Sequence, residues 1–155
     1  RPPKAASATP SILGRPSAPP ALATGSFSCT VDDKNLNFEA HSPLGTGMGE
    51  PIIGLAATAQ IKLKRVPKDL ATSELSKSLV HSWVDYPDLR LLFYKEQEAD
   101  APHGYVELVV KAQEIDDEGN ARGEYELTVF STEPPADKVE GVLLKAKGKV
   151  SCFVE

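Results

Sequence analysis

The chain has 155 residues, of which 41% are hydrophobic and 25% charged, enough for one domain with a buried core. No apolar run approaches the roughly 18 residues of a membrane-spanning helix, so we expect no transmembrane segment. The formal net charge is −5, but residues 1–77 hold nine Lys/Arg against six Asp/Glu, and residues 78–155 hold eight against sixteen. Binding to phosphate backbones needs clustered Lys and Arg, so the acidic second half argues against a nucleic-acid partner.

Residues 1–24 are rich in proline and alanine, with three basic residues and no acid. Such a segment cannot bury enough apolar surface to offset its ordering entropy, which predicts a flexible tail or linker. We interpret it as the spacer behind a removed signal peptide or anchor, which predicts a periplasmic or extracellular protein. A remnant of an organelle transit peptide is the alternative. Residues 25–155 are then a single β-rich domain.

One short pattern occurs twice, at residues 25–32 (GSFSCTVD) and 148–155 (GKVSCFVE). Both read Gly, two residues, Ser-Cys, one residue, Val and an acid, and apolar residues alternate as on one face of a strand. Cys29 and Cys152 are the only cysteines. We therefore expect these two segments to lie side by side, joined by a Cys29–Cys152 disulfide, which favours an oxidising compartment.

Alternation of apolar and polar residues is the main structural signal in the remaining chain. It predicts strands over residues 25–32, 36–41, 52–65, 88–97, 104–114, 122–131 and 142–155. The fold class predicted is mainly β, an antiparallel β-sandwich or β-barrel of about seven strands. Lys145, Lys147 and Lys149 have the two-residue spacing of a strand's solvated face.

One segment has a different period. Leu75, Leu79 and Trp83 recur every four residues, which predicts one amphipathic surface helix over residues 70–84. Its last third, with Val80 and Val84 beside Trp83, is also typical of a strand.

The predicted strand 88–97 is apolar on both faces, because Leu92 and Tyr94 add apolar surface to its second face. We expect the helix over 70–84 to cover that face. Tyr94, Trp83 and Tyr86, with His81 nearby, are then candidate contacts for a ligand or partner, since Trp and Tyr favour surfaces that are partly apolar and partly wet.

Sequence motifs for catalysis and metal binding are missing. No G-x-S-x-G, S-x-x-K or H-E-x-x-H pattern occurs, and both cysteines are assigned to a disulfide. His41, His81 and His103 lie far apart in sequence, and the single His81/Asp85 pair is weak evidence for zinc. The acidic residues 116–120 lack the register of a calcium loop. We expect no metal, no cofactor and no catalytic residue.

These observations predict an exported, non-catalytic binding or interaction domain of the cell envelope, with a protein or a small apolar molecule as its partner. Two alternatives stay open. A lipocalin-like carrier would hold a small apolar ligand in a cavity left by inward small residues, among them Ala57, Ala59, Ala112 and Ala146. A small hydrolase without a recognisable motif would need acids or His81 converging in a cleft.

Overall fold

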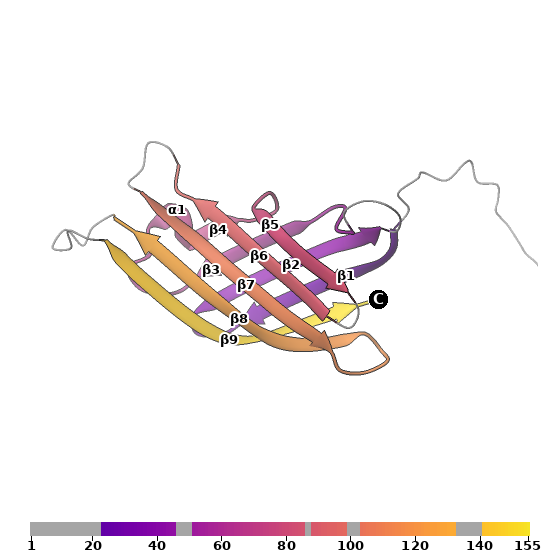
Figure 1. Ribbon diagram of the computed structural model, residues 1–155. Helices are drawn as coiled ribbons and strands as arrows, with labels where there is room; N and C mark the ends of the chain where they lie inside the picture. Colours follow the sequence, from indigo (N-terminus) through magenta and orange to yellow (C-terminus); the bar gives the residue numbers. More distant parts are fainter. Residues whose placement is uncertain (1–22, 46–50, 86–87, 99–102, 133–140) are drawn as a thin grey trace, which may run out of the picture.

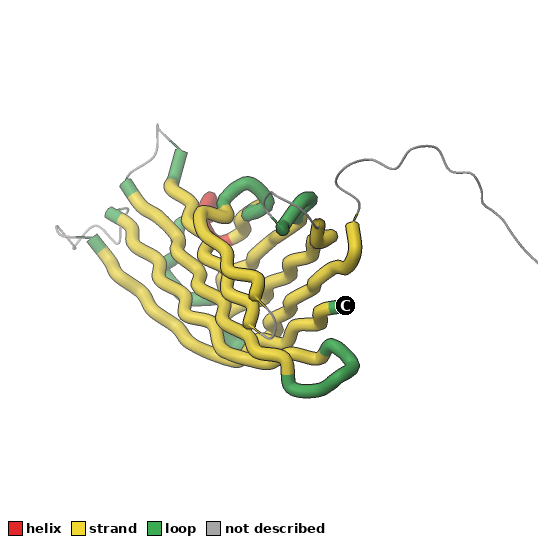
Figure 2. Tube along the Cα trace, turned by 45° about the vertical axis from the view of Figure 1, so that its right-hand side comes forward, coloured by secondary structure: helices red, strands yellow, loops and turns green. Residues whose placement is uncertain are grey.

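A computed structural model describes residues 23–45, 51–85, 88–98, 103–132 and 141–155 (Figures 1 and 2). Nine strands form one antiparallel sheet that curls into a half-barrel. The mainly β prediction is confirmed, whereas the expected count of about seven strands is wrong. Most of the predicted tail lies outside the described residues. In the part of the chain that is described, no helix is long and apolar enough to cross a membrane.

The strands follow the chain from β1 to β9, and neighbouring strands are antiparallel throughout. They are β1 (Ala23–Asp32), β2 (Leu36–Gly45), β3 (Ala56–Ile61), β4 (Thr72–Glu74), β5 (Leu79–Asp85), β6 (Asp88–Glu96), β7 (Gly104–Glu114), β8 (Asn120–Ser131) and β9 (Val142–Val154). Their order across the sheet is β4-β3-β2-β1-β9-β8-β7-β6-β5. The first and last strands therefore meet in the middle, and β4 and β5 are the two edges.

The junction of β1 and β9 is the predicted meeting of the two Ser-Cys segments. Phe27 lies opposite Val154, Thr30 lies opposite Ser151, and Cys29 lies directly opposite Cys152. The two cysteines form a disulfide across 123 residues of sequence, so the predicted pairing is confirmed.

The core lies between the two halves of the curled sheet. In Figure 1, β1–β3 cross behind β6–β8. Phe38 of β2 and Phe93 of β6 are separated by four strands in the sheet order, yet their rings meet edge to face with centroids 5.6 Å apart. The small inward residues named above are all buried and belong to the same core cluster: Ala57, Ala59, Ala112 and Ala146. Small side chains here let the two halves of the sheet approach and fill the interior.

The predicted helix over 70–84 is wrong. The only helix in the described residues is α1 (Lys68–Ala71), a single turn. It is followed by the short strand β4, a turn, and then β5. The last third of the predicted helix is thus a strand, which was the other interpretation of its valines and tryptophan. Among the residues with described positions, no helix covers the outer face of β6.

Serine side chains explain why the helix stops. The Ser73 hydroxyl donates to the carbonyl of Leu70 at 2.7 Å, and the Ser76 hydroxyl accepts from the amide of Ala57 at 2.9 Å. Such bonds offer the backbone an alternative to the helical ladder. Leu75 is nevertheless fully buried. The four-residue spacing from Leu75 to Leu79 therefore spans a turn between two strands.

The bounds of the second and third strands differ most from those predicted. The second strand continues to Gly45, although it was expected to end at residue 41. The strand expected over 52–65 is shorter, since β3 begins at Ala56 and ends at Ile61. Before β3, a single bridge pairs Ile52 with Leu44. The extra pairing at Gly45 is supported by a bond from its amide to the carbonyl of Pro51 at 2.8 Å.

Candidate functional site

The edge strand β5 carries two of the residues singled out from the sequence, His81 and Trp83. It pairs with β6 on one side only, with Trp83 opposite Arg90 and His81 opposite Leu92. Within the described ranges, no strand pairs with its other side. A seven-residue edge of this kind presents backbone N–H and C=O groups to any incoming strand.

Side chains on β5 are unusually apolar for an exposed edge. Val80 is 58% exposed and Trp83 is 51% exposed. Natural edge strands are commonly protected by lysine, proline or very short length. A bulge between Leu79 and His81 is the only such device that β5 shows, apart from the acid Asp85 at its end. An exposed tryptophan beside free backbone groups is typical of a surface that another chain covers.

A hollow lies next to the first half of β5. Its volume is ≈ 310 Å³, and it is lined by Ile52 and by residues 79–82. The segment before β3 therefore approaches β5 at Ile52 and leaves space between them. The hollow has apolar walls at Ile52, Leu79 and Val80, with His81 and Ser82 as its polar members.

Tyr94, the third singled-out residue, lies on β6 in a row of aromatic rings along the outer face of the sheet. Its ring centroid is 5.4 Å from that of Tyr105 on β7, which is 5.7 Å from that of Phe130 on β8. His103 meets Phe130 at 5.9 Å. Tyr86, the fourth singled-out residue, lies outside the described residues. The structure thus brings His81 and Trp83 together, and places Tyr94 on the adjacent strand.

The aromatic row explains how the outer face of β6 is covered without a helix. Tyr94, Tyr105 and Phe130 are each half-buried, because the rings of neighbouring strands stack against one another. The Tyr94 hydroxyl donates to Glu96 at 3.1 Å. Partial burial, then this bond and the charge of Glu96, raise the pKa of Tyr94. The row stabilises the sheet.

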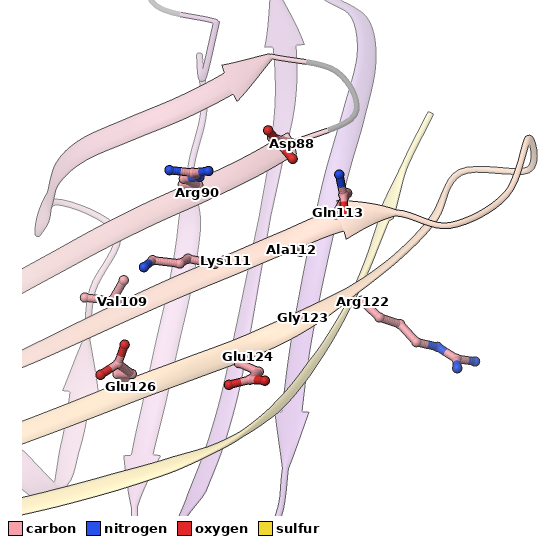
Figure 3. A pocket seen from close by; sticks show the side chains of 10 residues that line it. All are labelled: Asp88, Arg90, Val109, Lys111, Ala112, Gln113, Arg122, Gly123, Glu124 and Glu126. Carbon is pink, nitrogen blue, oxygen red and sulfur yellow. The ribbon is translucent and has the colours of Figure 1, made fainter.

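Charged side chains line a second hollow on the outer face of β6, β7 and β8 (Figure 3). Its volume is ≈ 500 Å³. It contains three cations and three carboxylates: Arg90, Lys111, Arg122, Asp88, Glu124 and Glu126. Arg122 points away from the others in Figure 3. Among the described residues the only ion pair is Lys62 with Asp32, so these charges are not paired with one another. We interpret them as a solvated face.

The lysine stripe follows the same pattern on β9. Lys145, Lys147 and Lys149 are exposed, as expected of a solvated face. Glu124 lies opposite Lys149, and Glu126 lies opposite Lys147. Opposite charges facing each other across two strands favour the observed register.

One polar contact links distant parts of the chain. The Tyr125 hydroxyl of β8 donates to Asp33, in the turn between β1 and β2, at 2.7 Å. Burial, then the bond to Asp33 and its charge, raise the pKa of Tyr125. Partial burial would raise the pKa of Asp33, but hydrogen bonds from Tyr125 and from the amides of Asn35 and Leu36, with the charge of Lys62, lower it overall. This pair holds the β1–β2 turn against β8, a structural role.

The acidic turn 116–120 is also structural. Asp116 accepts bonds from the amides of Glu118 and Asn120 at 2.9 and 3.1 Å. Bonds from Asn120, against slight desolvation, lower the pKa of Asp116. In the part of the chain with described positions, no three His, Cys, Asp or Glu side chains are grouped closely enough to hold a metal ion. His41, His81 and His103 lie on β2, on β5 and just before β7.

Sequence reasoning missed the aromatic row and the Asp33–Tyr125 contact. Tyr105 and Phe130 occupy the polar phase of their strands, which is the signal that could have revealed outward aromatic residues. Their alignment depends on the pairing registers of β6, β7 and β8 and was not visible in any one segment.

Comparison of this chain with models of protein families, with curated proteins and with solved structures finds no match. The functional argument therefore rests on the geometry described above.

Proposed function

We propose that this chain is an exported, non-catalytic interaction domain of the cell envelope, which binds a protein partner along β5. The observation that carries the proposal is the unpaired seven-residue edge with Val80 and Trp83 exposed on it. Addition of a partner strand to such an edge gives affinity through main-chain bonds and specificity through alternate side chains. His81 and Trp83 are the outward side chains that would determine which strand fits.

Export is supported by the disulfide between β1 and β9. Structural disulfides persist in oxidising spaces and are rare where thiol reductants maintain free cysteines. The Cys29–Cys152 bond connects the first and last strands at the centre of the sheet. The periplasm or the cell exterior is therefore the proposed location.

Interior packing favours binding at the surface over carriage of an apolar ligand. Phe38 and Phe93 meet across the interior and bring the two halves of the sheet into contact. The residues that a carrier would use as cavity walls are part of that packed core. A hydrolase has less support, since the acids with a lowered pKa, Asp33, Glu74 and Asp116, lie on different turns and strands.

Site-specific photo-cross-linking in cells tests the proposal. A photoreactive phenylalanine analogue replaces Trp83 on the edge, or Glu39 on β2, an exposed outer-face position in the middle of the sheet. We expect protein adducts in the envelope fraction from position 83 and none from position 39. Absence of adducts from position 83 in cells that export the folded chain would refute the edge as a binding surface.

A further inference from the structure

We propose that the partner of β5 is a second copy of this chain, paired antiparallel about a two-fold axis through Trp83. This inference rests on the proposed function, because it names the occupant of the same edge. Opposite residues of an antiparallel pair share a face, so each residue n of β5 would face residue 166 − n of the other copy. The paired segment would run from His81 to Asp85 on each strand.

Charge complementarity selects this arrangement. In it, His81 faces Asp85 of the second copy, and Asp85 faces the second copy's His81. An imidazole N–H donates to a carboxylate and attracts it further when the ring is protonated. Both residues are exposed on β5 and point to the same outer face. A two-fold axis repeats the favourable pair, so the strand is complementary to itself.

The isolated chain leaves an electrostatic conflict at the end of this strand. Asp85 lies directly opposite Asp88 of β6. Like charges directly opposite one another destabilise a strand pair. Neither carboxylate has an ion pair within the described part of the chain. His81 of a second copy would supply a hydrogen-bond donor at this position.

Neighbouring registers are less favourable. If the axis passes through Ser82, the bulge between Leu79 and His81 falls opposite Asp85, and if it passes through Val84, Asp85 faces Trp83. Neither register gives the carboxylate a polar partner. In the proposed register, Trp83 of one copy faces Trp83 of the second copy across the axis. On the inner face, Ser82 of each copy faces Val84 of the other. The exposed tryptophan thereby loses contact with water.

The free edge of β5 has room for a second strand, and pairing there is limited to two copies. His81 lines the hollow beside residues 79–82, so space is present next to the side chain that Asp85 of the second copy would meet. The opposite edge, β4, has only three residues and is followed at once by the buried Leu75. It offers too little backbone for a second strand addition. Pairing of β5 with β5 therefore closes at two copies and does not propagate into a filament.

Charge-swap variants of the full disulfide-bonded chain, measured by analytical ultracentrifugation, test the register. The wild type is expected to form dimers. His81→Asp places two carboxylates in apposition, and Asp85→Lys places a lysine against His81. Each single change disrupts both symmetric pairs, so each should weaken dimerisation about tenfold. The double variant His81→Asp/Asp85→Lys restores opposite charges and should restore the dimer. Asp117→Lys, an exposed turn position, is the matched control for net charge.

Three results would overturn the inference: a wild type that stays monomeric, single variants that dimerise as tightly as the wild type, or a double variant that fails to recover. Circular dichroism and thermal unfolding verify that each variant is folded.

Photo-adducts from position 83 distinguish the two proposals. Adducts with another protein, and no dimer, would reject self-pairing and retain β5 as a binding edge. Absence of any adduct would reject both.

Discussion

Asp33 and Tyr125 show how single residues connect parts of this fold that are far apart in sequence. Their bond joins the β1–β2 turn to β8 across 92 residues. Gly148 of β9 lies against both side chains, and a Cβ atom there would be 2.5 Å from Asp33 Oδ2 and 2.6 Å from Tyr125 Cε1. The glycine of the second Ser-Cys segment is therefore needed for close packing around this bond.

Replacing Tyr125 with Phe should reduce the free energy of unfolding by about 1–3 kcal/mol near neutral pH, because a partly buried bond to a charged group is lost. The wild-type advantage should be smaller on both sides of neutrality. In acid the advantage is lost as the pH falls through the lowered pKa of Asp33 in the folded chain, where this carboxylate becomes protonated. In alkali it falls above about pH 10, because Tyr125 then ionises in the unfolded chain while the folded chain still holds its proton. Urea unfolding of both proteins from acid to alkaline pH measures this difference. A pH-independent difference would contradict the role assigned to the pair.

Replacing Gly148 with Ala should destabilise the fold by about 1–3 kcal/mol, since the added methyl overpacks the Asp33–Tyr125 contact. Gly54→Ala is the matched control, because the nearest atom to a Cβ there is a Pro43 carbon at 3.5 Å. Thermal unfolding of the two variants compares them. Equal melting temperatures would show that the packing around Tyr125 tolerates a methyl group.

At the scale of elements, β1 and β9 hold the two halves of the sheet together, and β5 leaves one side of the sheet open. The Cys29–Cys152 bond lies near the centre of the sheet. Strands β1 to β4 lie on one side of it, and strands β5 to β9 lie on the other. A cross-link at this junction ties the β1–β4 side to the β5–β9 side. It constrains a loop of more than a hundred residues in the unfolded chain.

The variant Cys29→Ala/Cys152→Ala should therefore lose about 4–5 kcal/mol of unfolding free energy, the chain-entropy value for a loop of this size. Reduction of the wild type should cause a similar loss, whereas the variant should not respond to a reductant. Urea unfolding with and without dithiothreitol measures both effects. A wild type insensitive to full reduction would show that the strand pairing alone holds the junction.

At the scale of the whole molecule, the question is whether the curled sheet is filled or hollow. Phe38 and Phe93 meet across the interior, and both are fully buried. Replacing Phe93 with Ala should cost about 3–5 kcal/mol, because the halves of the sheet cannot collapse completely onto the cavity. Phe153→Ala, at a position 38% exposed, should cost much less.

Chemical denaturation of the two phenylalanine variants provides the comparison. If Phe93→Ala is as stable as the wild type, and the wild type takes up an apolar fluorescent probe in its interior, the filled-core description is wrong and carriage of a small apolar ligand regains support.

Local sequence patterns were sufficient for the β class, for most strands and for the meeting of β1 with β9. Alternation of apolar and polar residues predicts a strand from that segment alone, and two cysteines in matching sequence contexts predict a long-range contact. The strand over residues 104–114 and the Cys29–Cys152 bond were predicted as they are observed.

Tertiary structure alone decided the state of residues 70–84 and the identity of the open edge. Leu75, Leu79 and Trp83 satisfy a helical spacing, but other bonds make the segment a turn and a strand. These are the pairing of β5 with β6, the bond from Ser73 to the Leu70 carbonyl and the bond from the Ala57 amide to Ser76. His81 and Trp83 were predicted as candidate contacts for a ligand or partner within a helix, and they lie together on an edge strand. Which strand ends unpaired depends on the order of all nine, a property of the assembled sheet that no single segment encodes.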